Sequence, residues 1–198
     1  SFLLKNVVLP YWLEIEARNR GARHRNMRER LNALIYPIRD LALERKSFFK
    51  AITDADLFFL AIAADLNYLL NRYRSLLSDD TLAQSDLEVL KEIREVTLKI
   101  VQQRLQPEGF LFQVGVWSDH PDFLYAGYSG EEFPSIPRPD PNIAEDSAHS
   151  HRWPWWLESF RDSWPADHEH YKFYQNIVMR LASHFIEKVA VVFPDDRR

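Results

Sequence analysis

The chain has 198 residues, of which 46% are hydrophobic and 27% are charged, and its formal net charge is -4. This length and composition are typical of one globular domain with a sizeable core, so we expect a single domain over residues 1–198. The acidic balance argues against a general nucleic-acid binder. The absence of cysteine excludes disulfides, thiolate metal sites and a cysteine nucleophile.

Membrane and export signals are weak. No apolar run reaches the roughly 18 residues that a membrane-spanning helix needs, so we expect no membrane span. The apolar start at Phe2, Leu3 and Leu4, together with the lack of cysteine, slightly favours an exported or periplasmic protein, although the sequence leaves the compartment open.

Residues 1–106 are predicted to form a helical scaffold. A short helix is expected over Val7–Arg18, and apolar residues at helical spacing predict an amphipathic helix around Leu31–Ala42. The next helix, over residues 54–77, begins with apolar side chains almost all round and can be capped by Thr53 or Asp54. A helix without a polar face is typically central and buried.

The last helix of the scaffold carries start and stop signals of its own. Ser85 and Glu88 have the spacing of a capping box, in which each side chain accepts a free backbone N–H of the first turn. Pro107 and Gly109 are expected to end this helix.

Residues 107–152 form a loop-rich region. The stretch Phe110–Trp117 alternates like a strand but has no apparent partner, so we expect an extended segment that lies on the helices. Four prolines in Pro134–Pro141 exclude regular structure there. A loop of this length in a compact domain is usually functional or disordered. We expect a long ordered loop, at about 110–150, that covers one end of the fold.

Residues 153–193 are predicted to form two closing helices. One apolar face is shared by Trp153, Trp156, Leu157, Phe160 and Trp164, and Asp167 is the expected cap of the last helix. The predicted fold is therefore all-α, as a five- to six-helix bundle or an array of helical hairpins.

The candidate site lies in the second half of the chain. Six of the seven histidines and five of the six tryptophans fall between residues 117 and 184. Aromatic rings exclude water and shift the pKa of nearby titratable groups, which is typical of a binding cleft. The predicted catalytic groups are Asp119, His120, Asp122, Asp146 and His149. The predicted substrate-binding residues are Trp117, Tyr125, Tyr128, His151, Arg152 and Trp153.

Our first hypothesis is an enzyme, a hydrolase or a lyase, that acts on an oligosaccharide or another polyhydroxylated substrate. Glycoside hydrolysis needs two carboxylates, ~5–5.5 Å apart for retention or ~6.5–9.5 Å for inversion, and Asp119 or Asp122 with Asp146 could supply them. His120 and His149 would move or orient protons. A resemblance to loops inserted between helical hairpins in α/α-toroid carbohydrate enzymes is carried by Trp117-x-Asp119-His120-Pro121-Asp122 and Asp146-x-x-His149-x-His151-Arg152-Trp153-Pro154. A full toroid needs more helices than 198 residues supply.

The second hypothesis is a hydrolase that depends on zinc or another divalent metal; no other cofactor is expected. The ligands would come from the pairs His149 with His151 and His168 with His170, completed by Asp122 or Asp146. Residues two apart point to different faces of a helix, so such a pair chelates only on extended chain. The same histidines could equally have structural roles, and for His168, His170 and His184 we expect such a role.

The third hypothesis is a non-catalytic helical module that binds a protein partner through a face rich in tryptophan and arginine, the usual anchors of an interface. Arginines recur between Arg18 and Arg30, and we interpret them as a solvated helix face rather than a nucleic-acid site, because no aromatic residue is interleaved. Asp65 would either be paired in the core, by an arginine or Tyr68, or face the cleft.

Overall fold

The computed structural model describes residues 2–14, 26–35, 52–73, 83–106, 111–113 and 150–190. Helices make up 84% of these residues and no sheet occurs among them, which confirms the all-α fold. The α-helices in this part of the chain are α1 (Leu9–Leu13), which continues from a π-helical turn at Leu4–Val8, α2 (Met27–Ile35), α4 (Asp54–Arg72), α5 (Gln84–Arg104), α6 (Trp153–Asp162) and α7 (Glu169–His184), with a second π-helical turn at Phe185–Val189. The loop expected at about 110–150 lies almost wholly outside the described residues.

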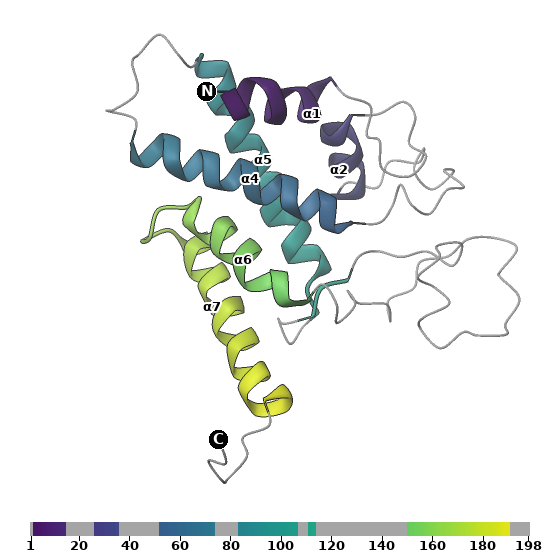
Figure 1. The fold of residues 1–198 in the computed structure, drawn as a ribbon, viewed down its shortest axis with the longest axis vertical. Helices are drawn as coiled ribbons and strands as arrows, with labels where there is room; N and C mark the ends of the chain where they lie inside the picture. Colours follow the sequence, from purple (N-terminus) through teal and green to yellow (C-terminus); the bar gives the residue numbers. More distant parts are fainter. Residues whose placement is uncertain are drawn as a thin grey trace, which may run out of the picture.

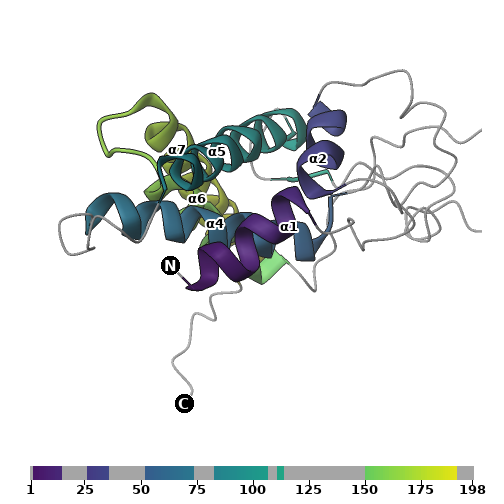
Figure 2. The same ribbon diagram turned by 90° about the horizontal axis from the view of Figure 1, so that it is seen from above.

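The helix α4 occupies the centre of the described fold, as its apolar pattern predicted. It packs against α5, α6 and the π-helical turn Leu4–Val8. In Figure 1, α4 and α5 cross in the middle, α1 and α2 lie on one side of them, and the α6–α7 hairpin lies on the other side. Figure 2 shows the crossing of α4 and α5 from above.

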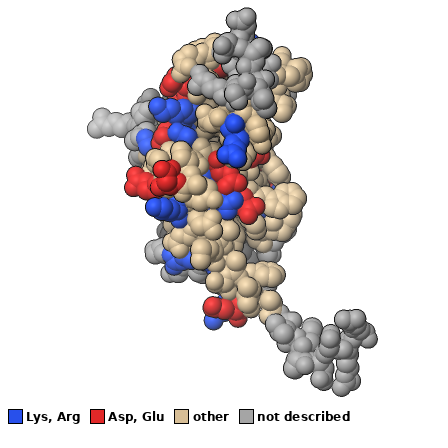
Figure 3. Space-filling model, turned by 90° about the vertical axis from the view of Figure 1, so that its left-hand side faces the viewer, with Lys and Arg blue, Asp and Glu red and all other residues tan. Residues whose placement is uncertain are grey.

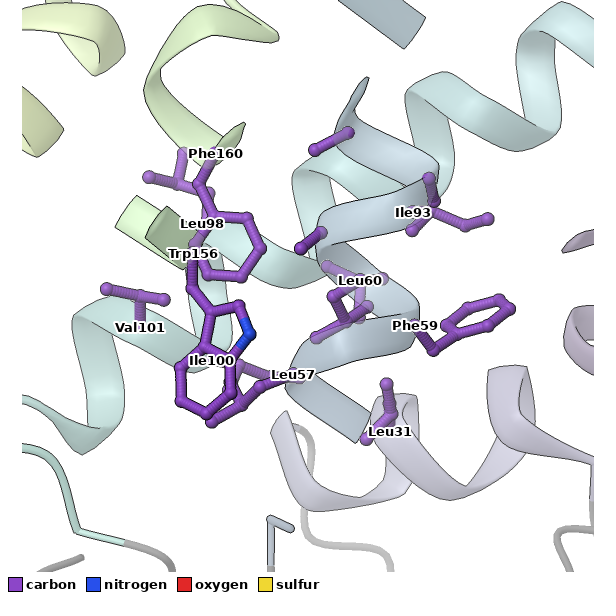
Figure 4. Close-up of a cluster of buried hydrophobic side chains, with 14 of the residues drawn as sticks. Leu31, Leu57, Phe59, Leu60, Ile93, Leu98, Ile100, Val101, Trp156 and Phe160 are labelled. Carbon is purple, nitrogen blue, oxygen red and sulfur yellow. The ribbon is translucent and has the colours of Figure 1, made fainter. Parts of the chain in front are cut away.

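The core is built from both sides of α4. Trp156 on α6 points toward Leu57 of α4 and Ile100 of α5, whereas Phe59 points to the opposite side of α4, toward Leu31 of α2 (Figure 4). All of these side chains are buried. Burial of large apolar side chains on two sides is what fixes α4 between the other helices.

The start of α4 is held by a capping box. Thr53 caps the helix, its Oγ1 accepting from the Asp56 N–H at 3.4 Å, while Asp56 Oδ2 accepts from the Thr53 N–H at 2.9 Å. Asp56 Oδ1 also accepts from Nη2 of Arg30 on α2. Arg30 and Asp56 are only 1% and 2% exposed, so the prediction that Arg30 lies on a solvated face is wrong. Its charge is neutralised inside the protein by a partner 26 residues away.

The capping box predicted for α5 does not form. The helix begins at Gln84, with Ala83 in the capping position and no side-chain cap. Ser85 is therefore already inside the first turn, where its side chain cannot cap, and Glu88 accepts from the Gln84 side chain at 3.0 Å. A shift of two residues in the capping position, from Ser85 to Ala83, removes the predicted interaction.

The cap of α7 also differs from the prediction. His168, not Asp167, is the last extended residue before the helix, and its Nδ1 accepts from the His170 N–H at 3.2 Å. A ring nitrogen thus takes the place of the carboxylate oxygen that we expected. The structural role predicted for His168 is confirmed by this bond.

A short extended segment follows α5. Leu105 and Phe112 form an isolated antiparallel bridge, supported by a hydrogen bond from the Gln106 N–H to the Leu111 carbonyl at 2.9 Å. The extended segment therefore has a partner, which the sequence did not reveal. Phe112 is buried against Trp153, with ring centroids 4.7 Å apart, and this contact holds the start of α6 beside the end of α5.

Candidate functional site

Three of the predicted site residues, His151, Arg152 and Trp153, are described by the structure. They follow one another at the start of α6, where a 3-10 turn spans Ser150–Arg152. The remaining candidates lie outside the described residues, namely Trp117, Asp119, His120, Asp122, Tyr125, Tyr128, Asp146 and His149. Their convergence on one cleft stays a prediction.

Trp153 and His151 lie in opposite environments. Trp153 is 7% exposed and packs in the core, edge-on against Trp156 at 5.2 Å between ring centroids. His151 is exposed on the 3-10 turn. The substrate-binding role that we predicted for Trp153 stays a prediction, and in the described part of the chain this ring supports the start of α6.

Arg152 bridges α6 and α4. Its Nη1 donates to Oδ2 of Asp54, in the first turn of α4. Its guanidinium carbon also lies 5.4 Å from the centroid of the Phe58 ring. Both partners of the ion pair are about one-third exposed, so the pair remains in contact with water. We predicted that Arg152 binds substrate, and in the structure its guanidinium holds a carboxylate of the chain itself.

An apolar surface extends from this ion pair along α4 and α6. We call it the α4–α6 face and define it by Phe58 and Ile62 on α4, by Arg152 at the N-cap of α6 and by Trp155 on α6. Phe58 and Ile62 are 43% and 40% exposed, and Trp155 is 75% exposed. The other tryptophans in the described residues are buried. Exposed apolar side chains that are neighbours on a surface mark a binding site more often than isolated ones do.

The position of Trp155 follows from how the two helices run. Arg152 meets Asp54, and farther along Asn67 Nδ2 donates to the Ser163 carbonyl at 3.4 Å. The helices α4 and α6 are therefore roughly parallel over this stretch. Ser159 hydrogen-bonds Asp65 of α4, and Trp155 lies one helical turn before Ser159 on the same side of α6. Trp155 thus shares the side of α6 that carries Ser159 and adjoins Arg152, the two residues that contact Asp65 and Asp54 of α4.

The far end of the α4–α6 face is acidic. Burial against α6 raises the pKa of the Asp65 carboxyl, the Ser159 hydrogen bond lowers it, and the nearby Asp162 raises it further. Glu158 and Asp162 share the guanidinium of Arg161, whose Nε lies 2.6 Å from Asp162 Oδ1. Asp65 lies on the surface between the two helices. The interpretations that pair it with an arginine or with Tyr68 in the core therefore do not fit the described residues.

Sequence reasoning did not find Trp155. The apolar stripe of α6 led us to Trp153 and Trp156, and both are core residues. The signal that could have found it is that Trp155 does not belong to the apolar stripe of α6. A large aromatic side chain on the polar side of an amphipathic helix has no core to enter, which marks it as a candidate for binding.

The histidines of α7 form a second cluster, around Trp164. The ring centroids of His168 and His170 lie 4.8 Å and 4.5 Å from that of Trp164. The guanidinium carbon of Arg94, a residue of α5, lies 3.9 Å from the same Trp164 centroid. Arg94 Nη1 also donates to the Ser163 carbonyl at 3.0 Å. Burial lowers the pKa of Arg94. The described contacts give this cluster a role in joining α5 to the loop between α6 and α7.

A metal centre has no counterpart in the described residues, where no group of three or more potential His, Cys, Asp or Glu ligands converges. Two of the predicted ligands, His168 and His170, contribute instead to the cap of α7. The divalent-metal hypothesis stays a prediction for the remaining candidates, and elemental analysis of the purified chain for zinc tests it.

Comparisons with family models, with curated proteins and with solved structures give no match to this chain. Among the helices that the structure describes, none combines the length and the apolar character required to cross a bilayer.

Proposed function

We propose that this chain is a helical binding module and that its α4–α6 face docks a partner protein. The observation that carries the proposal is the 75% exposure of Trp155, three residues after Arg152, whose guanidinium lies over the ring of Phe58. Tryptophan and arginine dominate the energetics of protein interfaces, because they bury large areas and combine apolar and polar contacts. An exposed tryptophan on a rigid helix is also preorganised, so little conformational entropy is lost when it is covered.

The charges around the α4–α6 face suggest the chemistry of the partner. Arg152 compensates Asp54, and the one guanidinium of Arg161 serves both Glu158 and Asp162. Asp65 has no cation among the ion pairs of the described residues. The acidic end of the face therefore has an excess of negative charge, which a basic side chain would complement. We infer a partner segment with a large apolar anchor and a lysine or arginine beside it.

Selection of displayed peptides against the full chain tests this proposal. Peptides that survive counter-selection against Trp155→Ala should combine an aromatic or leucine anchor with a basic residue. Their affinity should fall roughly 30-fold or more in Trp155→Ala, which is the loss expected of an interface hot spot. Replacing the basic residue of the peptide with glutamate should also weaken binding. Equal affinity for the wild type and Trp155→Ala would overturn the proposal.

A matched control distinguishes this face from general stickiness. Phe2 is 73% exposed on the N-terminal helical segment, so Phe2→Ala removes a comparable aromatic ring at a distant position. The selected peptides should bind Phe2→Ala as tightly as the wild type. Loss of binding in both variants would indicate non-specific adhesion to exposed rings.

The second candidate function is an enzyme that acts on an oligosaccharide. It is favoured by Trp155, whose exposed ring is the kind of flat surface on which a sugar stacks, and by the raised pKa of Asp65, since a carboxyl that retains its proton can act as a general acid. The catalytic groups in this hypothesis remain Asp119 or Asp122 with Asp146, and His120 and His149.

Tryptophan fluorescence during titration with a panel of neutral and acidic oligosaccharides tests the second function. A saturable change that is lost in Trp155→Ala would favour it, and turnover of the same sugar should then be abolished in Asp146→Asn. If sugars produce no change while basic peptides bind, the enzyme hypothesis is overturned and the binding-module proposal is retained.

A further inference from the structure

The second half of α7 presents an apolar surface that the other described helices leave open. The helix packs against α6 through its first half, where Tyr174 and Ile177 are buried. Farther along, Met179 and Ile186 are 60% and 65% exposed. Figure 1 shows α7 continuing past α6 toward the C-terminus, and Figure 3 shows few charged side chains on the surface that leads to this end. Such a surface is typical of an interface.

The stripe has a charged edge with a regular spacing. Met179, Ser183 and Ile186 follow one side of the helix because they are four and three residues apart. Arg180 and Glu187 lie along one edge of this stripe, seven residues apart, with Glu187 in the π-helical turn that continues α7. Both are exposed, and neither has an ion-pair partner among the described residues.

We propose that this stripe pairs α7 with α7 of a second copy of the chain, in antiparallel orientation. In a two-fold symmetric contact, if residue i meets residue j, then j meets i. With the axis close to Ser183, Arg180 of each copy lies opposite Glu187 of the other, which gives two equivalent ion pairs. In a parallel pair this edge of one helix would face the other edge of its partner, so Arg180 and Glu187 would not meet. The opposite charges at a seven-residue spacing therefore identify both the occupant and its direction.

The apolar residues fit the same arrangement. An antiparallel pair centred on Ser183 places Met179 of one copy beside Ile186 of the other, so each exposed apolar side chain covers another. The small Ser183 side chain at the centre leaves room for the helices to approach each other. The resulting contact buries Met179 and Ile186, the two most exposed apolar residues of the stripe.

Sedimentation equilibrium of the full chain over a range of concentrations tests the proposal. We expect a reversible monomer–dimer equilibrium. Ile186→Glu should abolish the dimer, because it places a charge in the apolar contact. Arg180→Glu and Glu187→Arg should each weaken the dimer roughly tenfold, since each replaces attraction with repulsion twice in one interface. Lys172→Glu, on the exposed side of the first half of α7, is the matched control and should have no effect.

Mixing the two charge variants provides the sharpest readout. Arg180→Glu leaves the edge all negative and Glu187→Arg leaves it all positive, so an equimolar mixture should dimerise at least as well as the wild type. Helix content and thermal midpoint at low concentration should be unchanged, because all of these residues are exposed. A monomeric wild type, a dimer insensitive to Ile186→Glu, or a mixture that does not recover association would each overturn the proposal.

Discussion

Two aspartates in the first turn of α4 each pair with an arginine from another part of the chain, and the two pairs differ mainly in how much water reaches them. Arg30 and Asp56 are almost completely enclosed, whereas the side chains of Arg152 and Asp54 are 30% and 29% exposed. Both pairs join α4 to a helix that is distant in sequence. The enclosed pair cannot exchange its partner for a ligand, while the open pair can, because water already competes for it. The same two residue types therefore serve the fold on one side of the helix and a surface on the other.

The largest expected effect comes from breaking the enclosed pair. Arg30→Met should lower the free energy of unfolding by about 3–5 kcal/mol, because Asp56 is left as a buried charge without its guanidinium. Chemical denaturation followed by circular dichroism measures this loss. The double variant Arg30→Met with Asp56→Asn removes both charges and keeps a hydrogen-bond acceptor for the cap, so it should be more stable than Arg30→Met alone. A loss below 1 kcal/mol in Arg30→Met would contradict the enclosed arrangement.

Apolar spacing predicted the described helices well because it depends on many residues at once. The buried positions of α5, including Leu90, Ile93 and Val101, and the buried face of α6 lie where the pattern indicated. Features that depend on one residue or on one distant partner were missed. Ser85 fails as a cap because α5 starts at Gln84, and nothing local in the sequence distinguishes Arg30 from the surrounding arginines.

The candidate site was less predictable than the fold, for a related reason. Clustering of histidine, aspartate and tryptophan drew attention to the second half of the chain, including the start of α6. It could not separate a tryptophan in the core from one on the surface. Trp155 and Trp156 are adjacent, yet one is 75% and the other 2% exposed, and only the direction in which α6 packs on α4 decides between them.

The second largest effect on stability should come from the Thr53 cap of α4, which involves Asp56 as the buried ion pair does. Thr53→Ala removes the acceptor of the Asp56 N–H while leaving the Arg30–Asp56 pair in place. We expect a loss of about 1 kcal/mol, which is typical of a helix cap. Thr53→Ser retains the hydroxyl and should recover most of the stability in the same denaturation experiment. A loss as large as that of Arg30→Met would mean that the cap and the ion pair form one inseparable unit.

The open pair should contribute much less to stability. Arg152→Met is the same substitution as Arg30→Met, and it should cost less than about 1 kcal/mol because water replaces the lost contact to Asp54. Its effect on peptide binding by the α4–α6 face should exceed its effect on unfolding. Measuring both quantities on one preparation separates the roles. If Arg152→Met destabilised the fold as strongly as Arg30→Met, the distinction between an enclosed and an open pair would be wrong.

The smallest effect concerns the third aspartate of α4, which has no arginine. Burial against α6 raises the pKa of Asp65 above its ordinary value of 3.8, so the folded chain binds this proton more tightly than the unfolded chain. Stability should therefore fall as the pH rises from about 3.8 through the raised value. Asp65→Asn removes the charge, and at neutral pH it should raise the free energy of unfolding by a few tenths of a kcal/mol, since solvent screens an exposed position.

The pH dependence of this difference is what identifies its cause. Below the pKa that Asp65 has in the unfolded chain, the carboxyl is protonated in both states, and the advantage of Asp65→Asn should disappear. Ser159→Ala removes the hydrogen bond that lowers the pKa of Asp65, so in that variant the loss of stability with rising pH should extend to higher pH. Denaturation of the three chains at acidic and neutral pH measures both effects. An Asp65→Asn chain that is less stable than the wild type at neutral pH would instead show that the Asp65 carboxylate is compensated, as those of Asp54 and Asp56 are.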